Sequence, residues 1–262
     1  MSTTPSLRFN VLARTDLGLV RDGNEDSALT SPFLIAVADG MGGHAGGEVA
    51  SRIAIHALKD LIELFDSSDI DEESREDLFM NIASTIDQKI SAAQKENSEL
   101  SGMGTTLTSL RLTHGSVQLM HVGDSRCYQW NGKVLKQLSV DHTVMQELID
   151  QGRLTPEEAL DHPQRSLLTQ ALMGDSGIDP LLVLYPAKAG DCFLLCSDGL
   201  NGILSDHEIA TILKKSKKEV VLDDLVAAVK VKGAPDNITI VLAEVVDGEE
   251  VALQTHLIGA AE

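Results

Sequence analysis

The sequence predicts a protein of the α+β class, and three observations support this. Phe33–Ala38 is a short, entirely apolar run, which is typical of a strand buried on both faces. Residues 48–65 and 75–96 show the periodicity of amphipathic helices. From Gly104 onward, short strand-like runs follow one another, and an Asn-Gly pair at 131–132 is a strong hairpin signal between two of them.

The remaining elements are predicted in chain order from the same patterns. We expect strands at 7–13, 28–31, 105–112, 117–122, 127–130, 134–138, 181–185, 192–197 and 237–246, and helices at 144–151, 156–160, 205–214 and 222–231. Ser205 and Glu208 form a capping-box pattern, which indicates the start of the helix there.

Domain organisation follows from the length of these segments. A length of 262 residues fits one large domain or two small ones, and of these we expect a single domain with a core at about 7–246. Residues 141–180 contain only short helical patterns, and their polarity predicts an excursion, or flap, that lies over a site. Residues 247–262 lack a periodic pattern and are expected to be a tail.

Composition excludes several functional classes. The chain has 40 acidic and 21 basic residues, a net charge of −19, so binding to nucleic acid or to anionic membranes is not expected. The N-terminus lacks the pattern of a signal peptide, and no apolar run is long enough to span a membrane. The 3 cysteines fit a reducing compartment. We therefore expect a cytoplasmic protein, and no interface pattern argues against a monomer.

Four times an apolar strand meets an aspartate at or near a glycine. The aspartates are Asp39, Asp124, Asp198 and Asp236. A single Asp-Gly pair is most often a turn. Four of them beside core strands would converge at one edge if the strands lie side by side, and converging carboxylates require cations. Because ligand sets made only of oxygen favour hard ions, the pattern indicates Mg²⁺ or Mn²⁺.

The motifs around these aspartates resemble those of the metal-dependent protein serine/threonine phosphatases, the protein phosphatase 2C (PP2C or PPM) family, in its compact bacterial form. The matching segments, in the family's order over about 21–241, are 21–26 (RDGNED), 38–44 (ADGMGGH), 104–106 (GTT), 123–126 (GDSR), 197–200 (SDGL) and 236–239 (DNIT). The resemblance implies a β-sandwich of two antiparallel sheets flanked by helices, with a dinuclear metal centre at one end. The hairpin-rich middle of the chain agrees with this fold.

The resemblance also implies the metal ligands. Asp39 would bridge two Mg²⁺ or Mn²⁺ ions, and Gly40 would supply a backbone carbonyl. Asp198 and Asp236 would complete the shell of the second ion, and Asp124 would join Asp198 around a third, weaker ion.

The implied reaction is hydrolysis of phosphoserine and phosphothreonine in proteins, by a hydroxide that bridges the two metals and without a covalent phosphoenzyme. Arg21 would grip the phosphoryl oxygens with its planar guanidinium. Glu25, Asp26 and Asn237 would lie in the outer shell of the metals. The implied partners are phosphorylated proteins and a cognate serine/threonine kinase.

The general acid is the one role for which three readings stay open. Larger eukaryotic members of the family have histidine directly after Asp-Gly, where this chain has Met41, and His44 follows three residues later. His44 donates the proton to the leaving alkoxide, positions substrate or water, or has only a neutral role in the loop.

Two other functions fit parts of the sequence. The glycines after Asp39 fit a dinucleotide-binding fingerprint, but no second strand ending in an acidic residue follows within about 30 residues. A catalytically inactive phosphatase fold that serves as a binding module remains the alternative. It is disfavoured because every acidic position of the motifs is filled.

Overall fold

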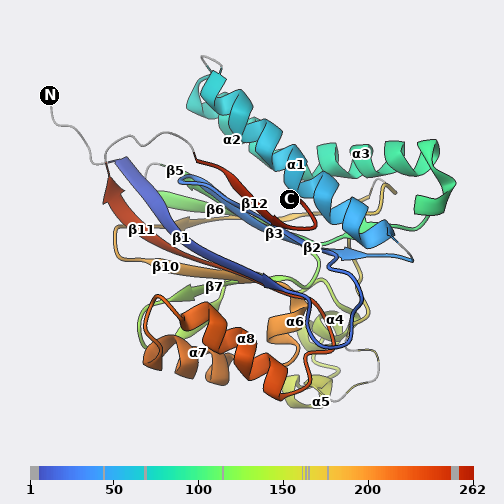
Figure 1. Ribbon diagram of the computed structural model, residues 1–262. Coiled ribbons are helices and arrows are strands. Elements are labelled where there is room, and N and C mark those ends of the chain that lie inside the picture. The colour runs from blue at the N-terminus through green and yellow to red at the C-terminus, as the bar shows by residue number, and fades with distance from the viewer. Residues whose placement is uncertain are drawn as a thin grey trace, which may run out of the picture.

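The structure is a computed structural model that describes residues 6–43, 45–67, 70–113, 115–160, 162, 164, 166–175, 177–248 and 254–262. Two antiparallel sheets pack face to face, and helices cover the outer side of each (Figure 1). The predicted α+β sandwich is thus confirmed.

The first sheet has the strand order β1-β11-β10-β7-β8. Its strands are β1 (Ser6–Asp16), β7 (Arg126–Trp130), β8 (Leu135–Gln137), β10 (Cys192–Cys196) and β11 (Ile238–Gly248). β1 and β11 pair over all eleven residues, so the two ends of the core lie side by side.

The second sheet has the order β12-β2-β3-β5-β6-β9, and β4 pairs with β3 beside this path. Its strands are β2 (Asp26–Thr30), β3 (Leu34–Met41), β4 (Gly104–Thr105), β5 (Leu107–Thr113), β6 (Ser116–Val122), β9 (Leu181–Pro186) and β12 (His256–Gly259).

Helices α1, α2 and α3 lie over the second sheet, and α7 and α8 cover the first (Figure 1). The helices are α1 (Gly46–Ser67), α2 (Glu72–Met80), α3 (Ile82–Glu96), the 3₁₀ helix Ser98–Leu100, α4 (Val144–Asp150), α5 (Pro156–Leu160), α6 (Asp198–Asn201), α7 (Asp206–Lys215) and α8 (Val221–Val231). The predicted capping box at Ser205 and Glu208 starts α7, with both of its hydrogen bonds present. Among the described residues, no helix is both long and apolar enough to cross a bilayer.

The packing of strand β3 explains why the run from Phe33 to Ala38 is entirely apolar. Ile35 and Val37 point into the core between the two sheets. Ala36 and Ala38 face the other way, into the layer beneath α1 and α3. Because alternate residues of a strand point to opposite faces, a strand covered on both sides requires an unbroken apolar run.

Two sequence predictions are corrected by the structure. The helix expected at 75–96 is two helices, which separate at Asn81, where a side-chain amide bonds the carbonyl of Asp77 and the backbone turns. The expected tail is wrong in part: β11 extends to Gly248, and His256–Gly259 pairs with β2 as β12. Ala261 is also buried. A four-residue strand is too short to show periodicity in the sequence.

Candidate metal centre

The predicted aspartates lie at one end of the sandwich because the strands that carry them end there. Asp26 and Asp39 are directly opposite each other in the β2–β3 pair. Asp198 follows the end of β10, which pairs with the start of β11 just after Asp236. Asp124 follows the end of β6. Asp39 interacts electrostatically with the other four, so the convergence predicted from the sequence is confirmed by the structure.

Two glycines allow the backbone segments of this end to touch. A Cβ atom on Gly40 would lie 2.1 Å from the carbonyl oxygen of Gly47 at the start of α1. A Cβ atom on Gly199 would lie 1.8 Å from the carbonyl oxygen of Asn237. Real Cβ atoms do not approach so closely. In these two cases the glycine beside the aspartate therefore serves close packing, which brings Asp39 to the first turn of α1 and Asp198 to the start of β11.

The carboxyl groups of the site are buried close to one another, which disfavours their ionised forms. Burial, and then the charges of Asp26 and Asp198, hold the pKa of Asp39 well above its ordinary value. Burial likewise raises the pKa of Asp26 to about 7 and that of Asp124 to about 8. Desolvated like charges of this kind are neutralised either by protons or by cations.

The donor set fits Mg²⁺ or Mn²⁺ better than zinc. The carboxylates brought together here and the backbone carbonyl of Gly40 offer oxygen donors alone, which are the ligands that hard ions such as Mg²⁺ and Mn²⁺ prefer. Structural zinc sites are built mainly from cysteine and histidine, and neither residue is among the predicted ligands. In the described part of the chain, no group of three or more histidine, cysteine or acidic side chains is already arranged to hold an ion.

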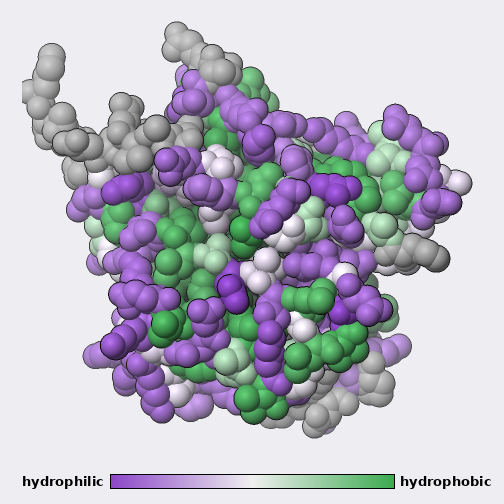
Figure 2. Space-filling view, in the orientation of Figure 1, coloured by the Kyte–Doolittle hydropathy of each residue, from purple (hydrophilic) through white to green (hydrophobic). Residues whose placement is uncertain are grey.

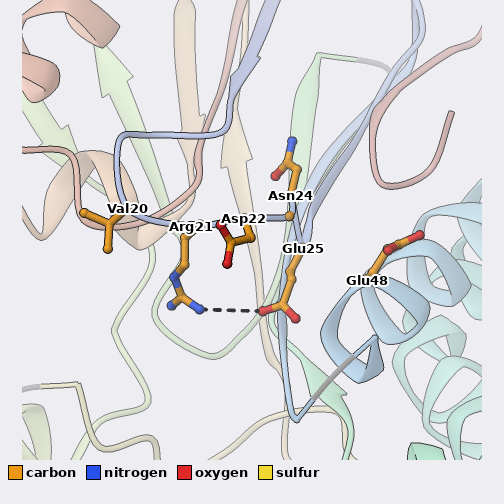
Figure 3. A pocket seen from close by; sticks show the side chains of 7 residues that line it. Val20, Arg21, Asp22, Asn24, Glu25 and Glu48 are labelled. Carbon is orange, nitrogen blue, oxygen red and sulfur yellow. Dashed lines mark ion pairs between the residues drawn. The ribbon is translucent and has the colours of Figure 1, made fainter.

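Arg21 lies at the rim of this cluster. Its guanidinium donates a hydrogen bond of 2.7 Å to Asp236 and lies 3.9 Å from Glu25. The hydrogen bond to Asp236 raises the pKa of Arg21 further above its ordinary value. Arg21 and Glu25 line a hollow of about 300 Å³ together with Val20 and Glu48. Figure 3 shows Arg21 and Glu25 pointing toward one another, with Val20 and Glu48 on either side. A half-exposed cation at this position can meet an anionic ligand.

The three residues expected in the outer shell are also brought together. The Asn237 side chain accepts a hydrogen bond from the amide of Glu25 (2.8 Å) and donates to the carbonyls of Leu17 and Gly23 (both 3.0 Å). Asp26 accepts a hydrogen bond of 2.7 Å from the hydroxyl of Ser197. Asn237 therefore fixes the loop that carries Arg21 and Glu25.

Buried hydroxyl groups that support the site were missed by the sequence analysis. Thr106 Oγ1 accepts from the amide of Asp39 at 3.0 Å and lies 2.6 Å from Ser125 Oγ. Thr105 Oγ1 donates to the Asp39 carbonyl at 2.9 Å. Ser197 Oγ bonds both Asp26 and the amide of Thr239. The sequence does carry a signal for these residues, because all four belong to the matching motifs. Ser125 and Ser197 are next to an aspartate in the chain, and Thr105 and Thr106 belong to the segment that lies beside the strand of Asp39.

His44 lies outside the described residues, so the structure does not test its role. Met41 is the last residue of β3, paired with Gly104.

The segment 141–180 is held to the core at its first residue and again at Leu172. Arg126 binds Asp141 through three hydrogen bonds of 2.6–2.9 Å, and Leu172 exchanges backbone hydrogen bonds with Thr105.

Comparison with known proteins gives a consistent result. The family model described as "Protein phosphatase 2C" matches residues 24–236. A serine/threonine protein phosphatase PstP of Mycobacterium tuberculosis is 42% identical over 258 residues, which cover 97% of this chain and 48% of the relative. A serine/threonine phosphatase stp of Listeria monocytogenes is 32% identical over 237 residues, 88% of this chain and 94% of the relative. The chain thus spans about half the length of the mycobacterial relative.

A solved structure is similar in fold as well. It is described as the catalytic domain of the serine threonine protein phosphatase PstP in complex with two manganese ions. It matches with a TM-score of 0.81 and 40% identity, covering 92% of this chain and 100% of the solved one.

Proposed function

The chain belongs to the protein phosphatase 2C family, and from this premise we propose that it hydrolyses phosphoserine and phosphothreonine in proteins, with two Mg²⁺ or Mn²⁺ ions as cofactors. One observation carries the proposal: Asp39, Asp124, Asp198 and Asp236 converge at the end of the sandwich where Arg21 lies. The solved PstP catalytic domain, which is 40% identical and is in complex with two manganese ions, supports the choice of cofactor.

The residues that would hold the ions are those implied by the motifs. Asp39 is proposed to bridge both ions, with the carbonyl of Gly40 as a further donor and with Asp198 and Asp236 on the second ion. Asp124 with Asp198 would hold a third, weaker ion. When bound, such ions lower the pKa of the water that attacks phosphorus and neutralise charge on the phosphoryl oxygens.

The chain's own side chains would bind and orient the substrate. Arg21 is proposed to bind two phosphoryl oxygens at once with its planar guanidinium. Its contact with Asp236, one of the proposed metal ligands, places that guanidinium next to the ions. Glu25, Asp26 and Asn237 would orient waters around the ions. His44 is proposed either to protonate the leaving alkoxide or to position substrate or water.

Further parts of the proposal concern organisation and partners. We infer one domain with a core at about 7–246 and a flap at 141–180 over the site. The substrates are proposed to be phosphoproteins, made by a cognate serine/threonine kinase. A monomeric state and a cytoplasmic location stay predictions; the second is supported by the free thiols of Cys127, Cys192 and Cys196.

The decisive experiment measures phosphate release from a phosphothreonine peptide with Mn²⁺, with chelator, and with an Asp236→Asn variant plus Mn²⁺. We expect turnover that depends on metal and is largely lost in the variant. Asp223→Asn is the control, because Asp223 is an exposed aspartate on α8 that pairs with Arg14. Mn²⁺ binding without turnover would favour the inactive binding module, and absence of metal binding would overturn the proposal.

A further inference from the structure

The loop between β1 and β2 exposes large apolar side chains to solvent. Leu17, Leu19 and Val20 are 41%, 61% and 66% exposed, and Arg21 follows directly. Single exposed apolar residues are ordinary, but contiguous ones mark binding surfaces. We call Leu17, Leu19 and Val20 the β1–β2 apolar surface.

The exposure of this surface is built into the fold. The amide of Leu19 donates to the carbonyl of Ala234 at 2.9 Å, and the carbonyl of Leu17 accepts from Asn237 at 3.0 Å. Between them, Gly18 lies so close to the segment before β11 that a Cβ atom there would lie 2.3 Å from the carbonyl oxygen of Asp236. The backbone is therefore pinned at three points, and the side chains are held outward rather than folded into the core.

The β1–β2 apolar surface is continuous with the candidate phosphate site. Val20 forms one wall of the hollow that contains Arg21 and Glu25, and the opposite wall is formed by Glu48 from the first turn of α1 (Figure 3). In the space-filling view, hydrophobic surface gathers below α1, over the region of the β1–β2 loop, with hydrophilic surface around it (Figure 2).

We propose that the β1–β2 apolar surface docks an apolar side chain of the substrate, one to three residues away from the phosphorylated residue. This inference rests on the proposed function. With the phosphate at Arg21, an extended peptide advances about 3.3 Å per residue, so only near neighbours of the phosphoresidue reach Val20 and Leu19. The acidic groups of Asp22, Glu25 and Glu48 around the hollow disfavour acidic residues at the same positions.

The test compares phosphothreonine peptides that differ by leucine or serine at each of the three positions before and after the phosphoresidue, with Mn²⁺ present. For the unmodified protein, we expect kcat/KM to favour leucine by roughly five- to tenfold at one or more positions, as expected for a partly buried apolar contact. The double variant Leu19→Ser/Val20→Ser should bring this ratio close to one.

Val134→Ser is the matched control. Val134 is also exposed, at 58%, but it lies in the hairpin after Trp130, at the end of the first sheet opposite to Asp198. This control should retain the leucine preference. Because each ratio is measured within one protein preparation, a general loss of activity in a variant does not change the conclusion.

Several outcomes would overturn the inference. Equal kcat/KM for leucine and serine peptides in the unmodified protein, or a preference that survives in the double variant, would exclude docking at this surface while leaving the phosphatase activity established. A dimer in sedimentation that only the double variant abolishes would assign the surface to a second copy of the chain. Absence of hydrolysis of every peptide would overturn the proposed function, and this inference with it.

Discussion

The guanidinium of Arg21 lies 2.7 Å from the carboxylate of Asp236, which is 215 positions later in the chain. This contact joins the loop before β2 to the loop before β11 and places a cation at the rim of the carboxylate cluster. The Arg21 side chain is 47% exposed, so the pair contributes little to stability. The contact instead holds the Arg21 side chain at the position where the phosphate of the substrate is proposed to bind.

Replacing Arg21 should therefore affect substrate binding far more than folding. For Arg21→Ala we expect KM for a phosphothreonine peptide to rise by about tenfold or more, since a charge-assisted bidentate contact is lost. Arg21→Lys should recover only part of the loss, because an ammonium cannot bind two oxygens in a fixed plane. Steady-state kinetics measure this, and thermal melts should move little. An unchanged KM in Arg21→Ala would contradict the assigned role.

Gly199→Ala should destabilise the fold, because the added Cβ would lie 1.8 Å from the carbonyl oxygen of Asn237. We expect a loss of about 3 kcal/mol or more in the free energy of unfolding, as in severe overpacking. Chemical denaturation measures it. Gly177→Ala is the control, since a Cβ atom there meets nothing within 4 Å. Equal stability of the two variants would contradict the close-packing role of Gly199.

Asp39→Asn should stabilise the metal-free protein while removing its response to metal. In chelator, the substitution replaces a carboxyl group whose ionisation is opposed by burial and by the charges of Asp26 and Asp198, so at neutral pH we expect a gain on the order of 1 kcal/mol. Thermal melts with chelator and with Mn²⁺ measure both effects. The prediction fails if Mn²⁺ stabilises the variant as much as the unmodified protein.

The stability of the chelated protein should fall as pH rises. In the unfolded chain an aspartate titrates near pH 3.9, whereas in the fold the pKa of Asp26 is raised to about 7 and that of Asp124 to about 8. Between about pH 4 and pH 8 the folded state thus binds more protons than the unfolded state, so each rise in pH favours unfolding. Unfolding should be followed from pH 5 to pH 8, with and without Mn²⁺.

Added Mn²⁺ should counteract this loss, and its stabilising effect should grow over the same pH range, because metal binds the deprotonated carboxylates. A stability of the chelated protein that rises steadily from pH 5 to pH 8 would show that these two carboxyl groups do not dominate its pH dependence.

Asn237→Ala should weaken metal binding as well as folding. Its side chain makes three hydrogen bonds to the loop of Arg21 and Glu25, and their loss should cost about 1–3 kcal/mol. Asn131→Ala is the control, because the Asn131 side chain accepts two backbone hydrogen bonds in the remote β7–β8 hairpin. Calorimetric titration with Mn²⁺ should show reduced affinity only for Asn237→Ala. Equal affinities in both variants would restrict Asn237 to a structural role.

Features that depend on neighbouring residues could be predicted from the sequence. The apolar run at Phe33–Ala38 specifies a strand covered on both faces, and the capping box at Ser205 and Glu208 specifies where α7 begins. The recurrence of aspartate and glycine beside such strands also predicted the carboxylate cluster, because strand ends that share an edge must meet there.

The distant groups that support one another could not be predicted from the sequence and are known only from the folded chain. The bond from Asn237 to Glu25, the burial of Ser197 against Asp26 and the pairing of β12 with β2 leave no local pattern in the chain. Even the outward position of Leu19 depends on Ala234, which is far away in sequence. Hydrophobic periodicity records whether a residue is covered, but not by what. The partner is chosen by long-range strand pairing and close packing, which act only once the chain has folded.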